Sequence, residues 1–358
     1  MSANLEIVDL SDFENRKSEL AAQVLHAASS NGFFYVTNHG LSPAEIENQF
    51  SLGERYFSLP DDVKESRGFR PDIFAGTRSL SDTNAAVGTK SWEQYLVQLG
   101  SHSRNEQGRW LAEDVLPHFR EQTVPFAEKA NQIAVQLLSL FEEELKLEPG
   151  FFAWQLDVDA KDCLTTFGWN RYPDPKQQGL RTDQLRLLPH ADTDIITLLF
   201  QRPGEGGLEI LPGRDATVHA STDPSGKDKG GLNSAWTGGI PEGKWTRMDP
   251  IAGAITVNIG NMLMRYSDEK LKSTYHRVRG PLPGETLGER RSMVLFVNGR
   301  GSTVIQGKDK AYTALTVADM VAANGKGYEN VKRDKEWQTR AMQFDAETSA
   351  RPAAVVAA

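Results

Sequence analysis

The pattern of hydrophobic and polar positions changes near residue 160. Before that point, apolar residues recur at three- and four-residue steps, which predicts helices over 11–30 and 118–147. Short apolar runs at 5–9 and 33–36 predict two strands among these helices. We therefore expect an N-terminal region over 1–155 that is helical with a few strands.

Local signals refine these boundaries. Ser11 is expected to cap the first helix, and Ser42, Pro43 and Glu45 together form the sequence pattern of a capping box at the start of another helix. The segment 61–105 is polar and contains several glycines. It predicts an irregular stretch of the kind that often forms lids or binding loops.

Beyond residue 160, short runs of β-branched and aromatic residues alternate with Gly/Pro turns. These runs are 163–172, 186–190, 195–201, 207–211, 245–247, 253–259, 274–279 and 291–299. Eight short strands with such turns predict a sandwich or barrel of the jelly-roll type. We place this domain, with C-terminal helices, at residues 156–345.

Three segments lie outside this regular pattern. Residues 221–241 are rich in Gly, Ser, Lys and Asp and predict a mobile surface insertion. Residues 317–343 predict a helix, a break at Gly325–Gly327 and a second helix. This segment is expected either to cover the barrel mouth or to contact another subunit. Residues 346–358, rich in Ala, Pro and Val, are expected to be a disordered tail.

Composition excludes several classes of protein. The 358 residues include 40 Lys+Arg and 48 Asp+Glu, and the net charge of −8 argues against a nucleic-acid-binding or polybasic membrane-binding protein. No apolar run is long enough for a transmembrane helix, and the N-terminus does not resemble a signal peptide. The single cysteine, Cys163, cannot form an internal disulfide and is expected to be a packed thiol. We therefore expect a soluble, cytoplasmic protein.

The segment Leu188–Asp194 carries the main candidate for chemistry. Alternate residues of a strand share a face, so His190 and Asp192 can present an imidazole and a carboxylate to one metal ion. His276, in a later predicted strand, is the best candidate for a third ligand. Two histidines and one carboxylate leave open positions of the kind that non-haem Fe(II) oxygenases use. The alternative is a histidine hydrogen-bonded to a nearby aspartate.

A second pair of alternate residues follows the distal histidine. Arg290 and Ser292 share a strand face and suit a carboxylate ligand, because guanidinium binds carboxylates in a bidentate manner and serine adds a donor. Asn170 and Tyr172 form a similar polar pair upstream. A buried Arg290 is costly unless it meets an anion, and this anion is either a co-substrate or a structural carboxylate.

Several ordered motifs resemble one known family. They are Asn31-Gly-Phe-Phe-Tyr-Val-Thr-Asn-His-Gly40, Tyr56-Phe-Ser-Leu-Pro60, Asn170-Arg-Tyr-Pro173, His190-Ala-Asp192, Gly206-Gly-Leu-Glu-Ile210, Val257-Asn-Ile-Gly-Asn261, Thr274-Tyr-His-Arg-Val278 and Arg290-Arg-Ser292. Over about residues 5–330 the chain resembles the isopenicillin N synthase-like branch of the Fe(II)/2-oxoglutarate-dependent dioxygenases. Two positions depart from the family pattern, Gly168 and Asn261, and neither is a predicted ligand.

The resemblance implies a mainly β fold with flanking helices, in which a double-stranded β-helix (jelly-roll) core follows an N-terminal α/β helical region. It implies that His190, Asp192 and His276 hold Fe(II), and that Arg290, Ser292, Tyr172 and Asn170 hold 2-oxoglutarate as co-substrate. With O₂, such enzymes form a ferryl intermediate that hydroxylates, desaturates or closes or expands a ring in the substrate. The expected substrate is a small-molecule specialised metabolite.

Substrate-pocket residues can be predicted from strand parity. Phe296 shares the strand face of Arg290, and Leu198 and Phe200 share a face with each other, so all three are candidates for the pocket, with core packing as the alternative. The segment 72–100, with Phe74, Arg78 and Trp92, is a candidate for the pocket mouth.

Two other functions stay open at this point. An oxidase of the isopenicillin N synthase type uses the same iron ligands without 2-oxoglutarate, and a non-catalytic ligand-binding protein can share the same fold. Whether the chain is a dioxygenase or an oxidase, we expect a small-molecule substrate, no nucleic-acid or membrane partner, and a monomer or weak homo-oligomer.

Overall fold

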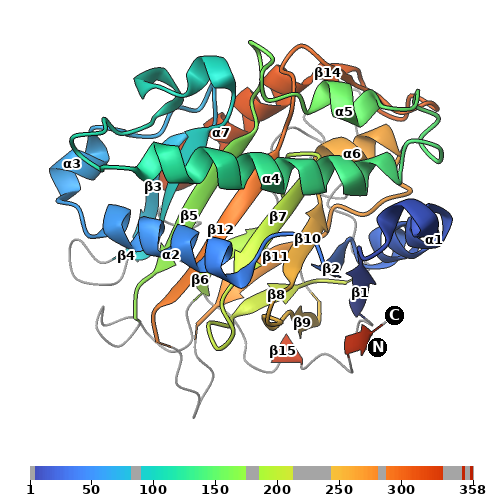
Figure 1. The fold of residues 1–358 in the computed structure, drawn as a ribbon, viewed down its shortest axis with the longest axis horizontal. Helices are drawn as coiled ribbons and strands as arrows, with labels where there is room; N and C mark the ends of the chain where they lie inside the picture. Colours follow the sequence, from blue (N-terminus) through green and yellow to red (C-terminus); the bar gives the residue numbers. More distant parts are fainter. Residues whose placement is uncertain are drawn as a thin grey trace.

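A computed structural model describes residues 5–81, 90–174, 185–212, 243–280, 288–333, 349–350 and 355–357. Within these residues the strands form two main sheets (Figure 1). The large sheet has the order β16 (Val355–Ala357), β1 (Leu5–Asp9), β2 (Phe33–Thr37), β10 (Ile255–Ile259), β7 (Ile196–Gln201), β12 (Arg290–Val297), β5 (Thr166–Tyr172), β4 (Lys90–Gln98), β3 (Gly76–Ser81). The small sheet has the order β15 (Ser349–Ala350), β9 (Trp245–Arg247), β8 (Leu208–Ile210), β11 (His276–Arg279), β6 (Leu185–His190). A two-stranded pair, β13 (Val304–Ile305) and β14 (Leu315–Thr316), stands apart.

The eight strands expected beyond residue 160 are all present, with ends that differ by a few residues. Along the chain, β5, β7, β10 and β12 enter the large sheet, whereas β6, β8, β9 and β11 enter the small one. Neighbours among these eight strands pair antiparallel. This order is that of a double-stranded β-helix, so the predicted fold class is confirmed.

The segment 61–105 was expected to be irregular, and this prediction was wrong for much of its length. It contains a short helix α3 (Asp61–Glu65) and the strands β3 and β4, which extend the large sheet beyond β5. The polar side chains of β4 misled the prediction because they are buried with partners. Glu93 pairs with Arg171 at 3.2 Å, and Gln94 donates to Asn170 at 2.7 Å.

Helices cover the outer face of the large sheet (Figure 1). They are α2 (Pro43–Phe57) and α4 (Phe119–Ser139), with α1 (Phe13–Ser30) packed on β1 and β2. The other helices are α5 (Phe151–Gln155), α6 (Asn261–Tyr266), α7 (Val317–Arg333) and the 3₁₀ turns η1 (Ser101–Ser103) and η2 (Glu106–Gly108). Phe126 of α4 packs on Phe167 and Phe200, with ring centroids 5.7 and 5.4 Å away. Helices cover the outer face of the large sheet, and the cavity lies against its inner face. The central strands therefore carry apolar side chains on the outer face and both polar and apolar side chains on the inner face.

The capping signals were partly correct. Ser42 and Glu45 form the expected capping box of α2. The N-cap of α1 is Asp12 in a left-handed conformation, not Ser11. Helix α4 ends at Ser139, earlier than expected, and the Glu142 carboxylate then accepts the backbone N–H groups of Gly150 and Phe152 in the turn before α5.

The predicted break at Gly325–Gly327 was wrong, since α7 runs through it to Arg333. Glycine at 325 has a tertiary reason: a Cβ there would overlap the carbonyl oxygen of Pro71, so the missing side chain lets α7 pack closely on that loop. The second predicted helix and the insertion 221–241 lie largely or wholly outside the described residues.

Five residues of the predicted disordered tail form strands. Ser349–Ala350 pairs with β9, and Val355–Ala357 pairs with β1. The backbone groups of two sheet edges offer these partners, which composition alone does not reveal. Cys163 is buried, as expected. Among the described residues, no helix is long and apolar enough to span a membrane.

Candidate metal centre and anion pocket

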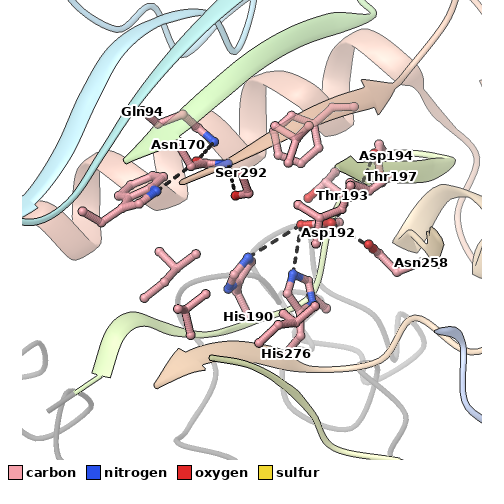
Figure 2. A pocket seen from close by; sticks show the side chains of 18 of the residues that line it. Gln94, Asn170, His190, Asp192, Thr193, Asp194, Thr197, Asn258, His276 and Ser292 are labelled. Atoms are coloured by element: carbon pink, nitrogen blue, oxygen red, sulfur yellow. Dashed lines mark hydrogen bonds and ion pairs between the residues drawn. The ribbon is translucent and has the colours of Figure 1, made fainter. Parts of the chain in front are cut away.

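A cavity of about 70 Å³ lies between the two sheets and collects most of the predicted site residues. Alternate residues of β12 line it, namely Arg290, Ser292, Val294 and Phe296. His190, Asp192 and His276 line it from β6, the turn after β6, and β11 (Figure 2). Strand parity and antiparallel pairing therefore bring together residues that are far apart in sequence.

The two histidines and Asp192 converge on one point. The Nε2 atoms of His190 and His276 each lie 3.7 Å from Asp192 Oδ1, and all three ligand atoms are within 4.8 Å of one another. His190 and His276 are register partners of β6 and β11, which places their rings 4.1 Å apart. All three side chains are buried.

Hydrogen bonds orient both imidazoles. His190 Nδ1 lies 2.8 Å from the Leu188 carbonyl oxygen, and His276 Nδ1 lies 3.3 Å from that of Thr274. A carbonyl accepts, so each Nδ1 carries the proton and each Nε2 presents a lone pair toward Asp192. Such outer contacts commonly fix the tautomer of metal-binding histidines.

Asp192 is oriented in the same way. Its Oδ2 accepts from Thr197 at 2.6 Å and from Asn258 at 2.9 Å, which leaves Oδ1 facing the histidines (Figure 2). Thr197 Oγ1 also lies 2.9 Å from Asp194 Oδ2. Burial and the neighbouring Asp192 raise the pKa of Asp194, so Asp194 can donate its proton to Thr197, which in turn donates to Asp192.

The donor set fits a divalent metal ion. Burial and the adjacent His276 lower the pKa of His190, which keeps this imidazole neutral. Burial raises the pKa of Asp192, but the two histidines together with the hydrogen bonds from Thr197 and Asn258 outweigh burial, and the net pKa is lowered. Within the described part of the chain, no Lys or Arg lies within ion-pair distance of Asp192. Two imidazoles and one carboxylate on one side of a point are the donors of a facial triad.

One other group of potential ligands occurs among the described residues. Glu113, His118 and Glu121 lie close together but are all exposed, and His118 is already hydrogen-bonded to both glutamates. Nothing beyond their proximity points to a bound ion there.

Arg290 gives the pocket an anion-binding end. It is 1% exposed, its guanidinium carbon lies 4.7 Å from the centre of the Tyr172 ring, and no described carboxylate lies within ion-pair distance of it. Its hydrogen bonds go to neutral partners, Gln201 Oε1 at 2.8 Å and Ser292 Oγ at 3.2 Å, and Nε has none. A buried guanidinium without a carboxylate is costly, so this end of the pocket favours an anionic ligand.

Gln94, Asn170 and Ser292 form a row of polar side chains across the large sheet (Figure 2), and Ser292 is the member that contacts Arg290. Gln94 donates to Asn170 Oδ1 at 2.7 Å, and Asn170 Nδ2 donates to Ser292 Oγ at 3.3 Å. Asn170 also accepts from Trp92 at 3.0 Å, which fixes its amide orientation. Ser292 Oγ therefore accepts from both Asn170 and Arg290, and its own hydroxyl proton is left to donate to a ligand.

The structure places the candidate pocket residue of one strand at the cavity and those of another strand away from it. Phe296 lines the pocket, 6.1 Å from Phe74, and Phe74, Arg78 and Trp92 of the segment 72–100 line it too. Leu198 and Phe200 do not line it; Thr197 and Leu199, of the opposite parity in β7, do. Both faces of β7 are buried, so hydrophobicity could not tell which one faces the cavity.

Sequence reasoning also missed several pocket side chains and partners. They are Gln94, Thr197, Gln201, Asn258, Asn298 and Asn324. Thr197 and Gln201 could have been found from the polar parity of β7. Asn324 had no local signal, because it lies on a helix whose position depends on tertiary packing.

Comparisons with known proteins agree with this geometry. Residues 5–116 match the family model for the N-terminal domain of non-haem dioxygenases described from morphine synthesis, and residues 225–299 match the 2OG-Fe(II) oxygenase superfamily model. The second match includes His276, Arg290 and Ser292.

Relatives and solved structures are similar over most of the chain. The 2-oxoglutarate-dependent dioxygenase frbA of Dothideomycetidae sp. is 25% identical over 78% of this chain and 80% of its own length. The validamycin A dioxygenase of Streptomyces hygroscopicus is 26% identical over 83% of this chain and 77% of its own length. A Neurospora crassa protein crystallised with α-ketoglutarate and thymine shares the fold with a TM-score of 0.70 at 21% identity, over 90% of this chain and 97% of its own.

These matches do not favour an oxidase that dispenses with 2-oxoglutarate, because the relatives are named as 2-oxoglutarate-dependent enzymes. The double-stranded β-helix, the buried His-Asp-His group and the two family models point the same way. The chain belongs to the 2OG-Fe(II) oxygenase superfamily and is an Fe(II)- and 2-oxoglutarate-dependent dioxygenase.

Proposed function

We propose that His190, Asp192 and His276 hold the Fe(II) ion of this dioxygenase. Support comes from the convergence of their ligand atoms within 4.8 Å, the hydrogen bonds that aim both Nε2 atoms, and the absence of a cationic side chain beside Asp192 among the described residues. Replacing His190 or Asp192 by alanine should abolish turnover and leave the fold intact. Retained turnover in either variant would contradict this ligand assignment.

The carboxylate of 2-oxoglutarate that does not bind iron is assigned to Arg290 and Ser292, with Tyr172 and Asn170 beside them. The observation that carries this proposal is the buried Arg290 guanidinium, which has only neutral hydrogen-bond partners among the described residues. Burial raises the pKa of Tyr172, so its phenol stays protonated and can donate. Asn170 contributes indirectly, because it leaves the Ser292 proton for the ligand.

When bound, Fe(II) and 2-oxoglutarate supply the O₂-dependent oxidation that gives succinate and CO₂ together with oxidised product. The residues of this chain do the rest. The two histidines and Asp192 leave one side of the metal position open to the cavity, Arg290 sets the direction of the co-substrate, and Phe74, Val294 and Phe296 exclude water from the reacting side.

The substrate is proposed to be a small molecule of specialised metabolism, which the enzyme hydroxylates, desaturates or converts by ring formation or expansion. The named relatives include enzymes whose substrates are of this kind, such as validamycin A. A cytoplasmic location, a monomer or weak homo-oligomer, and domain limits at 1–155, 156–345 and 346–358 complete the proposal.

An anaerobic spectrum tests the site directly. Protein loaded with Fe(II) and 2-oxoglutarate should show the weak visible charge-transfer band of a chelated keto acid, and Arg290→Ala should lose it at the same concentrations. The matched control is Arg291→Ala, since Arg291 points to the opposite face and pairs with Glu289 at 2.7 Å. Iron-replete protein without a band would contradict co-substrate binding.

A further inference from the structure

Helix α7 places one amide in the cavity without a partner. Asn324 is 8% exposed and lines the pocket together with Val321, one turn earlier on the same helix. No described residue makes a hydrogen bond to its side chain, and its Oδ1 is buried. A buried amide without partners lowers stability, so its presence at this position indicates a ligand that supplies the missing hydrogen bonds.

The position of Asn324 is held from two sides. At the start of α7, the Thr316 hydroxyl accepts the backbone N–H of Asp319 at 3.1 Å, and the Asp319 carboxylate accepts from the backbone N–H and hydroxyl of Thr316. One residue after Asn324, Gly325 packs on the backbone of Pro71. The amide is thus carried on a capped and closely packed helix and can act as a preorganised recognition group.

A second amide lines the same cavity. Asn298 is buried at the end of β12, and its Nδ2 donates to the carbonyl oxygens of Leu164 at 3.1 Å and Phe296 at 3.5 Å. These bonds fix the amide so that Oδ1, which accepts no hydrogen bond from a described residue, is available as an acceptor. Asn298 therefore supplies an acceptor, and Asn324 supplies both a donor and an acceptor.

The other groups of the cavity have tasks already. The iron ligands and Arg290 serve the metal and the co-substrate, while the Arg78 guanidinium stacks on Phe74 and Trp92 and donates to Gln94 at 2.5 Å. Phe74 and Phe296 form apolar walls at right angles to each other. A pair of neutral amides beside aromatic walls, with the Thr193 hydroxyl, is left for substrate recognition.

We propose that Asn324 and Asn298 recognise the substrate, and that this substrate carries a neutral group with adjacent N–H and C=O, such as a lactam or carboxamide, on a flat apolar body. The inference rests on the proposed function, since it assigns the substrate side of the same cavity. A carboxylate-bearing substrate is disfavoured because neither amide can neutralise a charge.

Ligand-observed NMR on the full chain loaded with Zn(II) and 2-oxoglutarate tests this proposal. The probes are benzamide and 2-pyridone, with benzoate as the matched carboxylate. Benzamide and 2-pyridone should bind at least about tenfold more tightly than benzoate, and Asn324→Leu should weaken both by about tenfold, the worth of one to two hydrogen bonds. Met320→Ala, at a buried residue of α7 that does not line the cavity, is the control for helix packing and should keep the preference for amides.

Two further readouts separate the possible failures. The melting temperature of Asn324→Leu should be unchanged or higher, because the variant removes a buried unsatisfied amide; a lower value would indicate a structural role. If it does not fold, Asn324→Ala replaces it. Equal or stronger binding of benzoate, no amide binding, or amide binding that ignores Asn324 would each overturn the proposal. If the wild-type protein does not bind 2-oxoglutarate at all, that result would instead contradict the proposed function.

Discussion

Buried charges are paired on the outer face of the small sheet and left without opposite charges in the cavity between the two sheets. On the face that points away from the cavity, Glu209 is 0% exposed and lies 2.8 Å from Arg277 Nε and 3.5 Å from Arg279 Nε. Trp245 covers the Arg277 guanidinium at 4.1 Å. Within the cavity and among the described residues, Asp192 has no Lys or Arg within ion-pair distance, and Arg290 has only neutral hydrogen-bond partners.

This difference separates charges that hold the fold from charges that suit a ligand. A buried ion pair compensates its own desolvation, whereas a lone buried charge lowers stability until a ligand of opposite sign arrives. Asp192 and Arg290 are in this state within the cavity. Asp192 fits a cation, and Arg290 fits an anion, which matches the Fe(II) and 2-oxoglutarate of the family.

The largest effect should come from breaking the paired region. Glu209→Gln removes the carboxylate that Arg277 and Arg279 share, and the free energy of unfolding in urea should fall by about 3–5 kcal/mol. Glu289→Gln is the control, because this glutamate pairs with Arg171 and Arg291 at the partly exposed surface and should cost ~1 kcal/mol or less. Similar losses in both variants would remove the distinction.

Unlike Glu209→Gln, Arg290→Met is expected to weaken co-substrate binding without lowering the stability of the fold. The dissociation constant of 2-oxoglutarate should rise about 30- to 1,000-fold, equivalent to roughly 2–4 kcal/mol, because the ligand carboxylate loses the guanidinium that pairs with it. The free energy of unfolding without co-substrate should stay equal or increase. Calorimetric titration and urea unfolding measure the two quantities. A clear loss of stability with 2-oxoglutarate binding retained would mean that Arg290 is structural.

A smaller effect, on metal affinity, is expected when the hydrogen bonds that orient Asp192 are removed. Asn258→Ala and Thr197→Val each remove one donor to Asp192 Oδ2, and metal affinity should fall about 10- to 100-fold. Competition with a metal chelator measures it. Thr256→Val is the control, since the Thr256 hydroxyl accepts from Gln201 and does not contact Asp192. Unchanged metal affinity in both donor variants would show that these contacts do not orient a ligand.

The smallest effect should be that of Ser292→Ala. Its hydroxyl adds one donor to the carboxylate that Arg290 binds, so the 2-oxoglutarate dissociation constant should rise about three- to tenfold, or ~0.5–1.5 kcal/mol. The same titration as for Arg290→Met measures this change. A loss as large as that of Arg290→Met would show that the serine, rather than the guanidinium, dominates the anion site.

Much of the candidate site could be predicted from local pattern. His190 with Asp192, and Arg290 with Ser292, are alternate residues of short strands, and strand geometry alone places each pair on one face. The eight strands of the barrel and the capping box at Ser42 are equally local features. His276 was the best candidate for the third ligand because it lies in a later predicted strand, and family motifs supported that choice.

Only the tertiary structure decided the remaining features of the site, because these features depend on which faces of the strands and helices are buried and on which segments bury them. Leu198 and Phe200 were assigned to the cavity because parity groups residues but does not say which group points inward when both faces are buried. Strand β4 was missed because its polar residues find partners only across the sheet. Asn324 reaches the cavity because Gly325 lets α7 pack on Pro71, a contact between segments that no local pattern connects.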